Sequence, residues 1–528
     1  MGYRWLAQRF GIRTVAPLTV HSTSGRQAQR TEDEDGLVVQ VLRHGRTQMD
    51  SEQWHLGQAL KHEGVHLELL SRLFQKMGPD VVGQWIAQEP TSAQARRAGF
   101  LYEWLTGGQI HGHENASGNY VDALDDQQYL TANHPQMNRR WRVVDNMPGS
   151  PLFCPMVRRS DAVRLAMGLD LSGDVGRLVG EFGEDMLTRS ASWLSIKESK
   201  ASFTIEREGS RNERIRRFAA AMAQYCGTLP DPLEAQSLVA LQRSILSERS
   251  ASPLHLGLRR SPVFVGRTLH YEPVVDYLAP HHDHVAGMLE GLRTFAQRTA
   301  GANTIARAAI LSFGFVYIHP LSDGNGRISR FLVNDTLRRD GAIPAPLILP
   351  VSSVIQASMR HYDRVLESIS GPMMRAVAPE VSFTSQATTF EDGVQSNLVF
   401  NQWDELLPAW RYMDLSQHVR YLSDVLRVTV NKELRKEAVY LQSFDQARRA
   451  VLDIIDGRDQ DIDRIVTAIS QSGRASAKLR KEYPQVFGQD SLSKEGMAIE
   501  KAVLRAFAGD APQASGPDAQ PERARHIG

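Results

Sequence analysis

A run of twelve residues, His319 to Arg330, brings together side chains that suit phosphate chemistry. His319 is of the residue type most able to accept a proton near neutral pH. Asp323 provides a hard oxygen ligand of the kind that Mg²⁺ takes when it also holds substrate phosphates. Arg327 and Arg330 stand three residues apart, so on a helix they project from one side, and their guanidinium forks match phosphate geometry.

The turn Gly324-Asn325-Gly326 lies between the carboxylate and the arginines. A glycine-flanked turn that opens a helix exposes backbone N–H groups at the positive end of the helix dipole, which favours an anionic oxygen. Asn325 adds a side-chain amide to these backbone groups. The spacing therefore predicts a phosphate site beside a base. The plainer interpretation is a glycine turn between two helices with incidental surface arginines.

The sequence HPLSDGNGRISR over these residues resembles the Fic motif, HPFx[D/E]GNGRxxR. The one departure is Leu321, where the family usually has a phenylalanine that faces the core, so the smaller side chain affects packing more than chemistry. The resemblance implies an all-α catalytic domain that transfers part of a nucleotide, most often AMP from ATP, to a protein hydroxyl. It identifies the chain as a suspected protein adenylyltransferase, a nucleotidyltransferase that uses Mg²⁺.

The resemblance also assigns a role to each residue of the motif. His319 would take the proton from a Ser, Thr or Tyr hydroxyl, and Asp323 would hold Mg²⁺ between the α- and β-phosphates. The other motif positions would bind the nucleotide: Gly324, Asn325, Gly326, Arg327 and Arg330. Tyr362 falls near the place where the family often has a tyrosine beside the adenine, although a helical tyrosine is more often simply half-buried.

A second resemblance lies upstream, in a predicted helix near 195–209. Ser202 and Glu206 fit the family's inhibitory motif [S/T]xxxE[G/N], with Arg207 in place of the Gly or Asn, and stand four apart on one helix face. The resemblance implies that Glu206 pairs with Arg330 and leaves ATP in an unproductive pose, as in the self-inhibited class whose inhibitory helix precedes the Fic core. Without it, the charged segment would be typical of a solvated helix face.

The segment Ser261 to Gly266 is short, β-branched and aromatic, so it predicts a strand or hairpin arm. It lies where the family has its flap, a hairpin that positions the target by pairing with an extended segment. The residues expected in this role are Val263, Phe264, Val265 and Gly266. The alternative is an ordinary edge hairpin.

Two other patterns compete with this interpretation. His62-Glu63-Gly64-Val65-His66 is a literal HExxH, the pattern of a zinc protease, but no third ligand stands out and Gly64 suits a rigid metal-bearing helix poorly. The cluster His281-His282-Asp283-His284 suits either a metal or a polar loop after Pro280.

Composition bounds the remaining possibilities. The chain has 528 residues, 42% hydrophobic, and a net charge of +1, which gives no global reason to expect nucleic acid or a membrane as a partner. Two cysteines cannot form a disulfide framework, and no signal peptide or membrane-length apolar run is seen. We therefore expect a cytoplasmic protein.

The hydrophobic periodicity predicts a mainly α protein: a helical Fic-type bundle core with a small β-hairpin flap, flanked by N- and C-terminal helical regions. The helix over 303–318 is apolar almost all round and should lie in the middle of the bundle. The expected divisions are an N-terminal helical region (1–159), a Fic domain (160–370), a linker (371–400), a C-terminal helical domain (401–508) and a disordered tail (509–528).

The sequence leaves several functions open. AMP transfer from ATP to a protein target, of which the protein itself is one candidate, is the first. Transfer of UMP, phosphate or phosphocholine is an alternative because the phosphate-binding residues do not fix the base or the orientation of the donor. Removal of AMP is another, and a nucleotide-binding adaptor without turnover is a rival of a different class, although an adaptor would not need His319.

Overall fold

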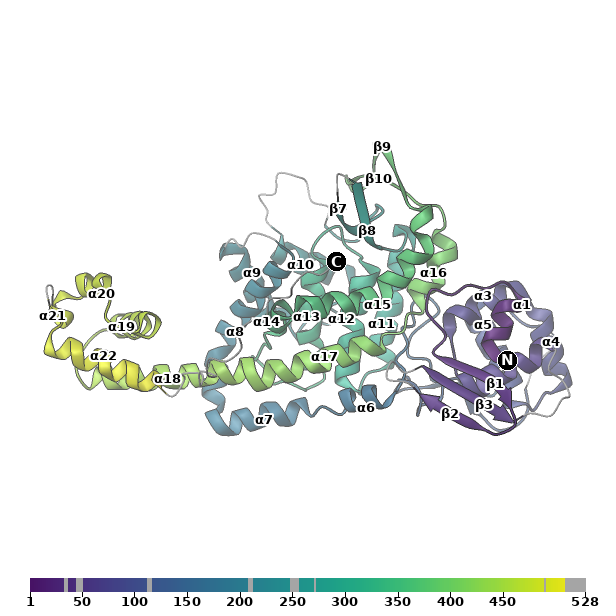
Figure 1. Cartoon of the computed structure of the whole chain (residues 1–528), viewed down its shortest axis with the longest axis horizontal. Coiled ribbons are helices and arrows are strands. Elements are labelled where there is room, and N and C mark those ends of the chain that lie inside the picture. The colour runs from purple at the N-terminus through teal and green to yellow at the C-terminus, as the bar shows by residue number, and fades with distance from the viewer. Residues whose placement is uncertain are drawn as a thin grey trace, which may run out of the picture. The chain divides into compact units, whose positions relative to one another are not determined.

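The computed structural model describes residues 1–32, 37–43, 51–111, 116–207, 212–246, 256–269, 272–488 and 491–508. The protein is mainly helical with small sheets, as predicted (Figure 1). It divides into two compact units, Met1–Gly173 with Ser192–Thr429, and Asp174–Ala191 with Val430–Gly528. These divisions differ from the five expected from the sequence, whose tail lies outside the described residues.

The N-terminal part of the first unit combines helices with two small sheets. Strands β1 (Val20–Gly25) and β2 (Gln29–Glu32) flank β3 (Val38–Arg43), and β1 runs parallel to it. A second sheet has the order β4 (Val121–Asp122), β6 (Val143–Asp145), β5 (Gln136–Asn138). The helices are α1 (Gly2–Arg9), α2 (Glu52–Gln58), a π-helix (Ala59–Glu63), α3 (Leu67–Met77), α4 (Pro79–Gln88) and α5 (Ala93–Thr106).

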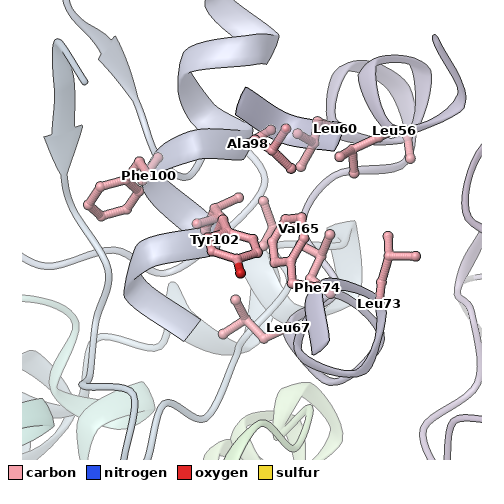
Figure 2. Packing of buried hydrophobic residues seen from close by; sticks show 14 of the residues in the cluster. Leu56, Leu60, Val65, Leu67, Leu73, Phe74, Ala98, Phe100 and Tyr102 are labelled. Carbon is pink, nitrogen blue, oxygen red and sulfur yellow. The ribbon is translucent and has the colours of Figure 1, made fainter. Parts of the chain in front are cut away.

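The helical segment that includes α2 and α3 is broken at Gly64, which has φ +84°. A side chain there would meet the Tyr129 hydroxyl at 2.2 Å, so only glycine lets the chain turn against that ring. Leucines and aromatic residues from α2, α3 and α5 pack together in the core beside the break (Figure 2). The helices before and after Gly64 therefore bury their apolar faces in the same core.

The centre of the first unit is helix α12 (Thr304–Ile318), of which thirteen of fifteen residues are buried. It packs against α11 (His282–Arg298), α13 (Asn325–Arg339) and α17 (Ser416–Val428), which confirms the predicted central helix. The other helices of the first unit are α6 (Asp161–Met167), α9 (Asn212–Tyr225), α10 (Ala235–Ile245), α14 (Val351–Ala357), α15 (Met359–Val377) and α16 (Trp403–Arg411). Helix α8 (Glu184–Ile205) begins in the second unit and ends in the first, and α7 (Leu171–Phe182) belongs mainly to the second unit.

Two antiparallel hairpins lie close together in the first unit (Figure 1). The expected flap is β7 (Phe264–Leu269) paired with β8 (Glu272–Leu278). Residues 371–400, expected as a linker, instead form the end of α15, a 3₁₀ turn (Ala378–Glu380), and a hairpin of β9 (Ser382–Thr389) and β10 (Gln395–Val399). Phe264 and Phe383 join the two hairpins, with ring centroids 5.3 Å apart.

The second unit has its own apolar core, built from Ile462, Ile465, Val466, Ile469 and Val503 among others. Its helices are α18 (Arg435–Leu452), α19 (Asp459–Ser472), α20 (Ala477–Glu482), α21 (Pro484–Phe487) and α22 (Lys494–Phe507), with a π-helical turn (Thr429–Leu434) before α18. Among the described residues, no helix combines the length and apolarity needed to span a bilayer.

Candidate active site

The turn between α12 and α13 places His319 at the end of one helix and the glycines at the start of the next. The N–H of His319 still bonds to the Phe315 carbonyl at 3.0 Å, while its own backbone is left-handed at φ 50°, ψ 56°. Gly324, at φ +93°, begins α13 in a conformation that favours glycine. The chain therefore reverses sharply and points the N-terminus of α13 back towards the histidine.

The Asn325 side chain braces this turn from within. Its Oδ1 accepts the Leu321 N–H at 3.0 Å and its Nδ2 donates to the Leu321 carbonyl at 2.7 Å. Leu321 itself is fully buried. The amide that the sequence offered to an anion is thus engaged within the loop, and a phosphate here would meet the backbone N–H groups at the start of α13.

Arg327 and Asp323 form an ion pair one helical turn apart. Arg327 Nη2 donates to Asp323 Oδ1 at 2.8 Å, and the guanidinium lies over the Phe203 ring at 5.1 Å. The Arg327 side chain is only 1% exposed, whereas that of Asp323 is 41% exposed. The buried Arg327 therefore holds Asp323 in position, while the Asp323 carboxylate stays accessible. An accessible carboxylate oxygen is a hard ligand of the kind that Mg²⁺ prefers.

Arg330 is buried against α8. Its Nε donates to Ser202 Oγ at 2.8 Å, and its Nη2 donates to the Ser202 carbonyl at 3.1 Å and to Glu206 Oε1 at 2.7 Å. Its Nη1 is also buried but has no hydrogen-bond partner among the residues that the structure describes. A buried cationic donor without a partner is costly, so this nitrogen is suited to receive an anionic oxygen.

The Glu206 carboxylate occupies the space directly over Gly326. A side-chain carbon on Gly326 would come within 2.1 Å of Glu206 Oε1 and 3.3 Å of Arg330 Nη1. Burial would raise the pKa of Glu206, but the guanidinium of Arg330, with help from Arg327, holds that pKa below its ordinary value. A carboxylate thus stands at the helix N-terminus where an anionic ligand would bind.

The His319 imidazole is kept neutral by its surroundings. Burial, and then the positive charge of Arg259, lower its pKa to about 4. Its Nδ1 lies 3.2 Å from the Val316 carbonyl, which suits an Nδ1–H donor and leaves Nε2 as the proton acceptor. A neutral His319 with a free Nε2 lone pair is suited to act as a general base.

Tyr362 belongs to an aromatic cluster next to this centre. It is 8% exposed, with ring centroids 6.2 Å from Phe313 and 6.0 Å from Tyr421. Burial raises the pKa of its hydroxyl, and the positive charge of Arg330 opposes that rise. Tyr362 therefore lies close to the guanidinium that Glu206 binds.

Residues 232–337 match the model of the Fic/DOC family. The chain contains a Fic/DOC domain. It is 31% identical over 146 residues to protein adenylyltransferase fic-1 of Caenorhabditis elegans, covering 27% of each chain. It is 30% identical over 193 residues to protein adenylyltransferase Fic of Aedes aegypti, covering 35% of each. The chain thus spans about a third or less of the length of these curated relatives.

The chain also has a partial match among solved structures. A Fic family protein from Desulfovibrio desulfuricans G20 is 18% identical, with a TM-score of 0.39, and the match covers 62% of this chain and 89% of that one.

Several residues around the Fic/DOC site carry no sequence signal. Gln242 is buried, and its amide donates to the Asp323 carbonyl at 3.0 Å and accepts the Gly257 N–H at 2.9 Å. Arg259 donates to the His319 carbonyl at 2.7 Å. Glu198, on α8, accepts from the N–H and hydroxyl of Ser352 at the start of α14. Each of these contacts joins a single polar residue to a partner far away in the sequence. Only Glu198 has a position related to a predicted site residue, because it lies four residues before Ser202.

Glu63 and His66 of the HExxH sequence form hydrogen bonds with the backbone and are not arranged as zinc ligands. Glu63 accepts the N–H groups of Tyr3 at 2.9 Å and Ser22 at 3.2 Å, and the left-handed Gly64 ends the helix before His66. His66 Nδ1 caps α3 by accepting the Leu69 N–H at 3.2 Å. The two histidines therefore do not lie one turn apart on a single helix, as a zinc protease requires.

The second histidine cluster lies at the foot of the flap, where α11 begins. Potential ligand atoms of His281, His282 and Asp283 lie within 4.8 Å of one another. His281 Nδ1 also accepts the Asp283 N–H at 3.4 Å, so the cluster already has a role as the N-cap of α11.

Proposed function

We propose that this protein transfers AMP from ATP to a Ser, Thr or Tyr hydroxyl of a protein, with Mg²⁺ held by Asp323. The observation that carries the proposal is the buried Arg330 guanidinium facing Gly326 at the start of α13, in the same turn as a neutral His319. The match of residues 232–337 to the Fic/DOC family and the names of the similar relatives support this reaction over others.

Each residue has a physical task in such a transfer. His319 Nε2 would accept the hydroxyl proton as the target oxygen bonds to the α-phosphorus, and the bond to the β-phosphate breaks to release pyrophosphate. Backbone N–H groups around Gly324 and Gly326 would hold the phosphate oxygens. Arg327 and Arg330 would stabilise the charge that develops on the leaving group, while Mg²⁺, when bound, supplies neutralising charge beside it.

Glu206 restrains this reaction in our proposal. Its carboxylate pairs with Arg330 and fills the space above Gly326, so it competes with a phosphate for the same guanidinium and the same helix N-terminus. ATP bound beside Glu206 would lack one of its arginines and would be held out of line for attack. The inhibitory helix is α8, which precedes the Fic/DOC domain in the chain.

Labelling with ATP tests the proposal. Purified protein is incubated with α-labelled ATP and Mg²⁺, beside the Glu206→Gly and His319→Ala variants. We expect weak self-labelling of the parent, stronger labelling of Glu206→Gly and none of His319→Ala. Label from UTP alone would identify uridylyl transfer instead, and no label from any nucleotide with any variant would favour the adaptor. Faster loss of AMP from a pre-labelled protein in the parent than in Glu206→Gly would indicate removal of AMP.

A further inference from the structure

Arg259 is a buried cation with no assigned role. It is 1% exposed, and its guanidinium donates to three backbone carbonyls: His319 at 2.7 Å, Ser261 at 2.8 Å and Pro280 at 2.5 Å. Its backbone N–H donates to the Pro320 carbonyl at 2.9 Å. A buried guanidinium spread over carbonyls that are far apart in the sequence fixes their separation, because its donors form a rigid fork.

These carbonyls belong to the two parts that must meet during transfer. Ser261 and Pro280 lie just outside the two ends of the β7–β8 hairpin, which spans Phe264 to Leu278. His319 is the proposed base. An isolated β-bridge between Leu258 and Leu321 runs alongside the same contact. One side chain therefore ties both feet of the hairpin to the backbone of the histidine.

The second hairpin, β9–β10, also contacts the segment next to Arg259. Asp392, in the turn between β9 and β10, is 5% exposed and accepts the Arg260 N–H at 2.7 Å and the Ser261 hydroxyl at 2.8 Å. Asp392 and the Arg259 guanidinium thus both bind the segment at Ser261, one through its hydroxyl and one through its carbonyl. Arg259 also places a positive charge near the His319 imidazole. The backbone of His319 is left-handed, a costly conformation that persists only where surrounding contacts hold it.

We propose that Arg259 is the positioning residue that sets the separation between the base and the target-binding hairpin in the AMP transfer proposed above. Its charge also adds to burial in lowering the pKa of His319. The role has two separable parts. The charge acts on the proton affinity of His319, and the forked shape acts on the hairpin. Lysine retains the charge without the fork, and methionine retains neither.

Arg259→Lys and Arg259→Met, made in the Glu206→Gly background, separate the two parts. The pKa of His319 is followed by NMR of ¹³C-labelled histidine, and the hairpin by hydrogen exchange of the amides of β7 and β8. We expect Arg259→Met to raise the pKa of His319 towards its ordinary value and to move the acid limb of the labelling rate to higher pH. Arg259→Lys should leave that pKa nearly in place, while both variants speed exchange in the hairpin by at least about tenfold.

Arg307→Met is the matched control. Arg307 is also buried on α12, and its side chain donates to Asp340 at 2.7 Å and to Thr299 at 2.7 Å, away from the histidine end of the helix. We expect this variant to lose thermal stability without moving the pKa of His319 or the exchange of the hairpin. Equal shifts in Arg307→Met and Arg259→Met would overturn the proposal, because they would reflect a general loss of packing.

The two proposals fail differently. Absence of AMP labelling in every variant, including Glu206→Gly alone, overturns the transfer and with it the part that Arg259 plays in it. An unchanged His319 pKa and unchanged hairpin exchange in Arg259→Met, in a background that does label, overturn the role of Arg259 alone.

Discussion

The competition for Arg330 predicts that AMP transfer is released in steps when the partners of Arg330 at the end of α8, Ser202 and Glu206, are removed one at a time. Ser202→Ala removes the neutral acceptor of Arg330 Nε, a loss of about 1 kcal/mol that should raise the rate of AMP incorporation about fivefold. Glu206→Gln keeps the shape of the side chain but removes its charge. Hydrogen bonds to charged groups contribute roughly 1.5–3 kcal/mol, and because the Glu206 side chain is 32% exposed, the lower value applies, or roughly tenfold in rate.

Glu206→Gly removes the whole side chain and should give the largest increase, about 10- to 100-fold. The assay is the initial rate of AMP incorporation from α-labelled ATP with Mg²⁺. Thr204→Ala is the matched control, because the Thr204 hydroxyl is exposed and donates only to the Lys200 carbonyl on its own helix. The expected order is parent and Thr204→Ala, then Ser202→Ala, then Glu206→Gln, then Glu206→Gly.

A rate for Glu206→Gln equal to that of the parent, beside a fast Glu206→Gly, would refute this reasoning. Glu206 directly follows the last residue of α8, so glycine there also loosens the helix end. That outcome would show that the restraint depends on a rigid helix end and not on the charge that Arg330 receives.

Three further predictions concern neighbouring parts of the molecule. Burial raises the pKa of Glu198 to about 7, so the stability it contributes is fully present below its ordinary pKa near 4.5 and is lost as the pH rises through 7. Relative to Glu198→Gln, the parent should lose about 3 kcal/mol of unfolding free energy between about pH 4 and about pH 8, measured by urea denaturation, and a parallel pH dependence in both would contradict this. In the Glu206→Gly background, Gly326→Ala should cut AMP incorporation by roughly 10²-fold because a methyl group narrows the site at the start of α13; undiminished labelling would show that phosphate does not approach Gly326. His66→Ala should lower the melting temperature through loss of about 1 kcal/mol from the α3 cap while leaving the zinc content, measured by mass spectrometry, unchanged.

The motif could be read from the sequence because its geometry is local. The α12–α13 turn is built from Phe315 to Asn325, so the spacing of the glycines and of the arginines after them determines which groups face the turn. The contacts of Arg259 and Gln242 could not be read, because they join residues 60 and 81 positions apart through single side chains with no repeating pattern.

The second hairpin lies in the segment that the sequence predicts as a linker, and its strands lack a sequence signal for a related reason. Strand β9 is exposed along nearly its whole length, so its sequence lacks the alternation of apolar and polar residues by which a half-buried strand is recognised. It is held by a few contacts outside that pattern, such as Phe383 on Phe264 and Asp392 on Ser261. A Ser/Thr-rich composition describes exposure, and it does not distinguish a hairpin from a connecting segment.

Glu198 and Glu206 differ in burial, and this difference indicates which part of the segment moves when the inhibition by Glu206 is relieved. Glu198 and Ser202 lie one turn apart on α8, and Glu206 comes four residues later, directly after the helix ends. Glu198 is 1% exposed and binds α14, whereas the Glu206 side chain is 32% exposed. Displacing Glu198 would leave a buried N–H group of Ser352 unpaired, which costs more than freeing an accessible carboxylate. We therefore expect activation to move only the last turn of α8, so that Glu198→Gln leaves AMP incorporation at the parent rate while Glu206→Gln raises it. An equal increase in both variants would mean that the whole helix must leave.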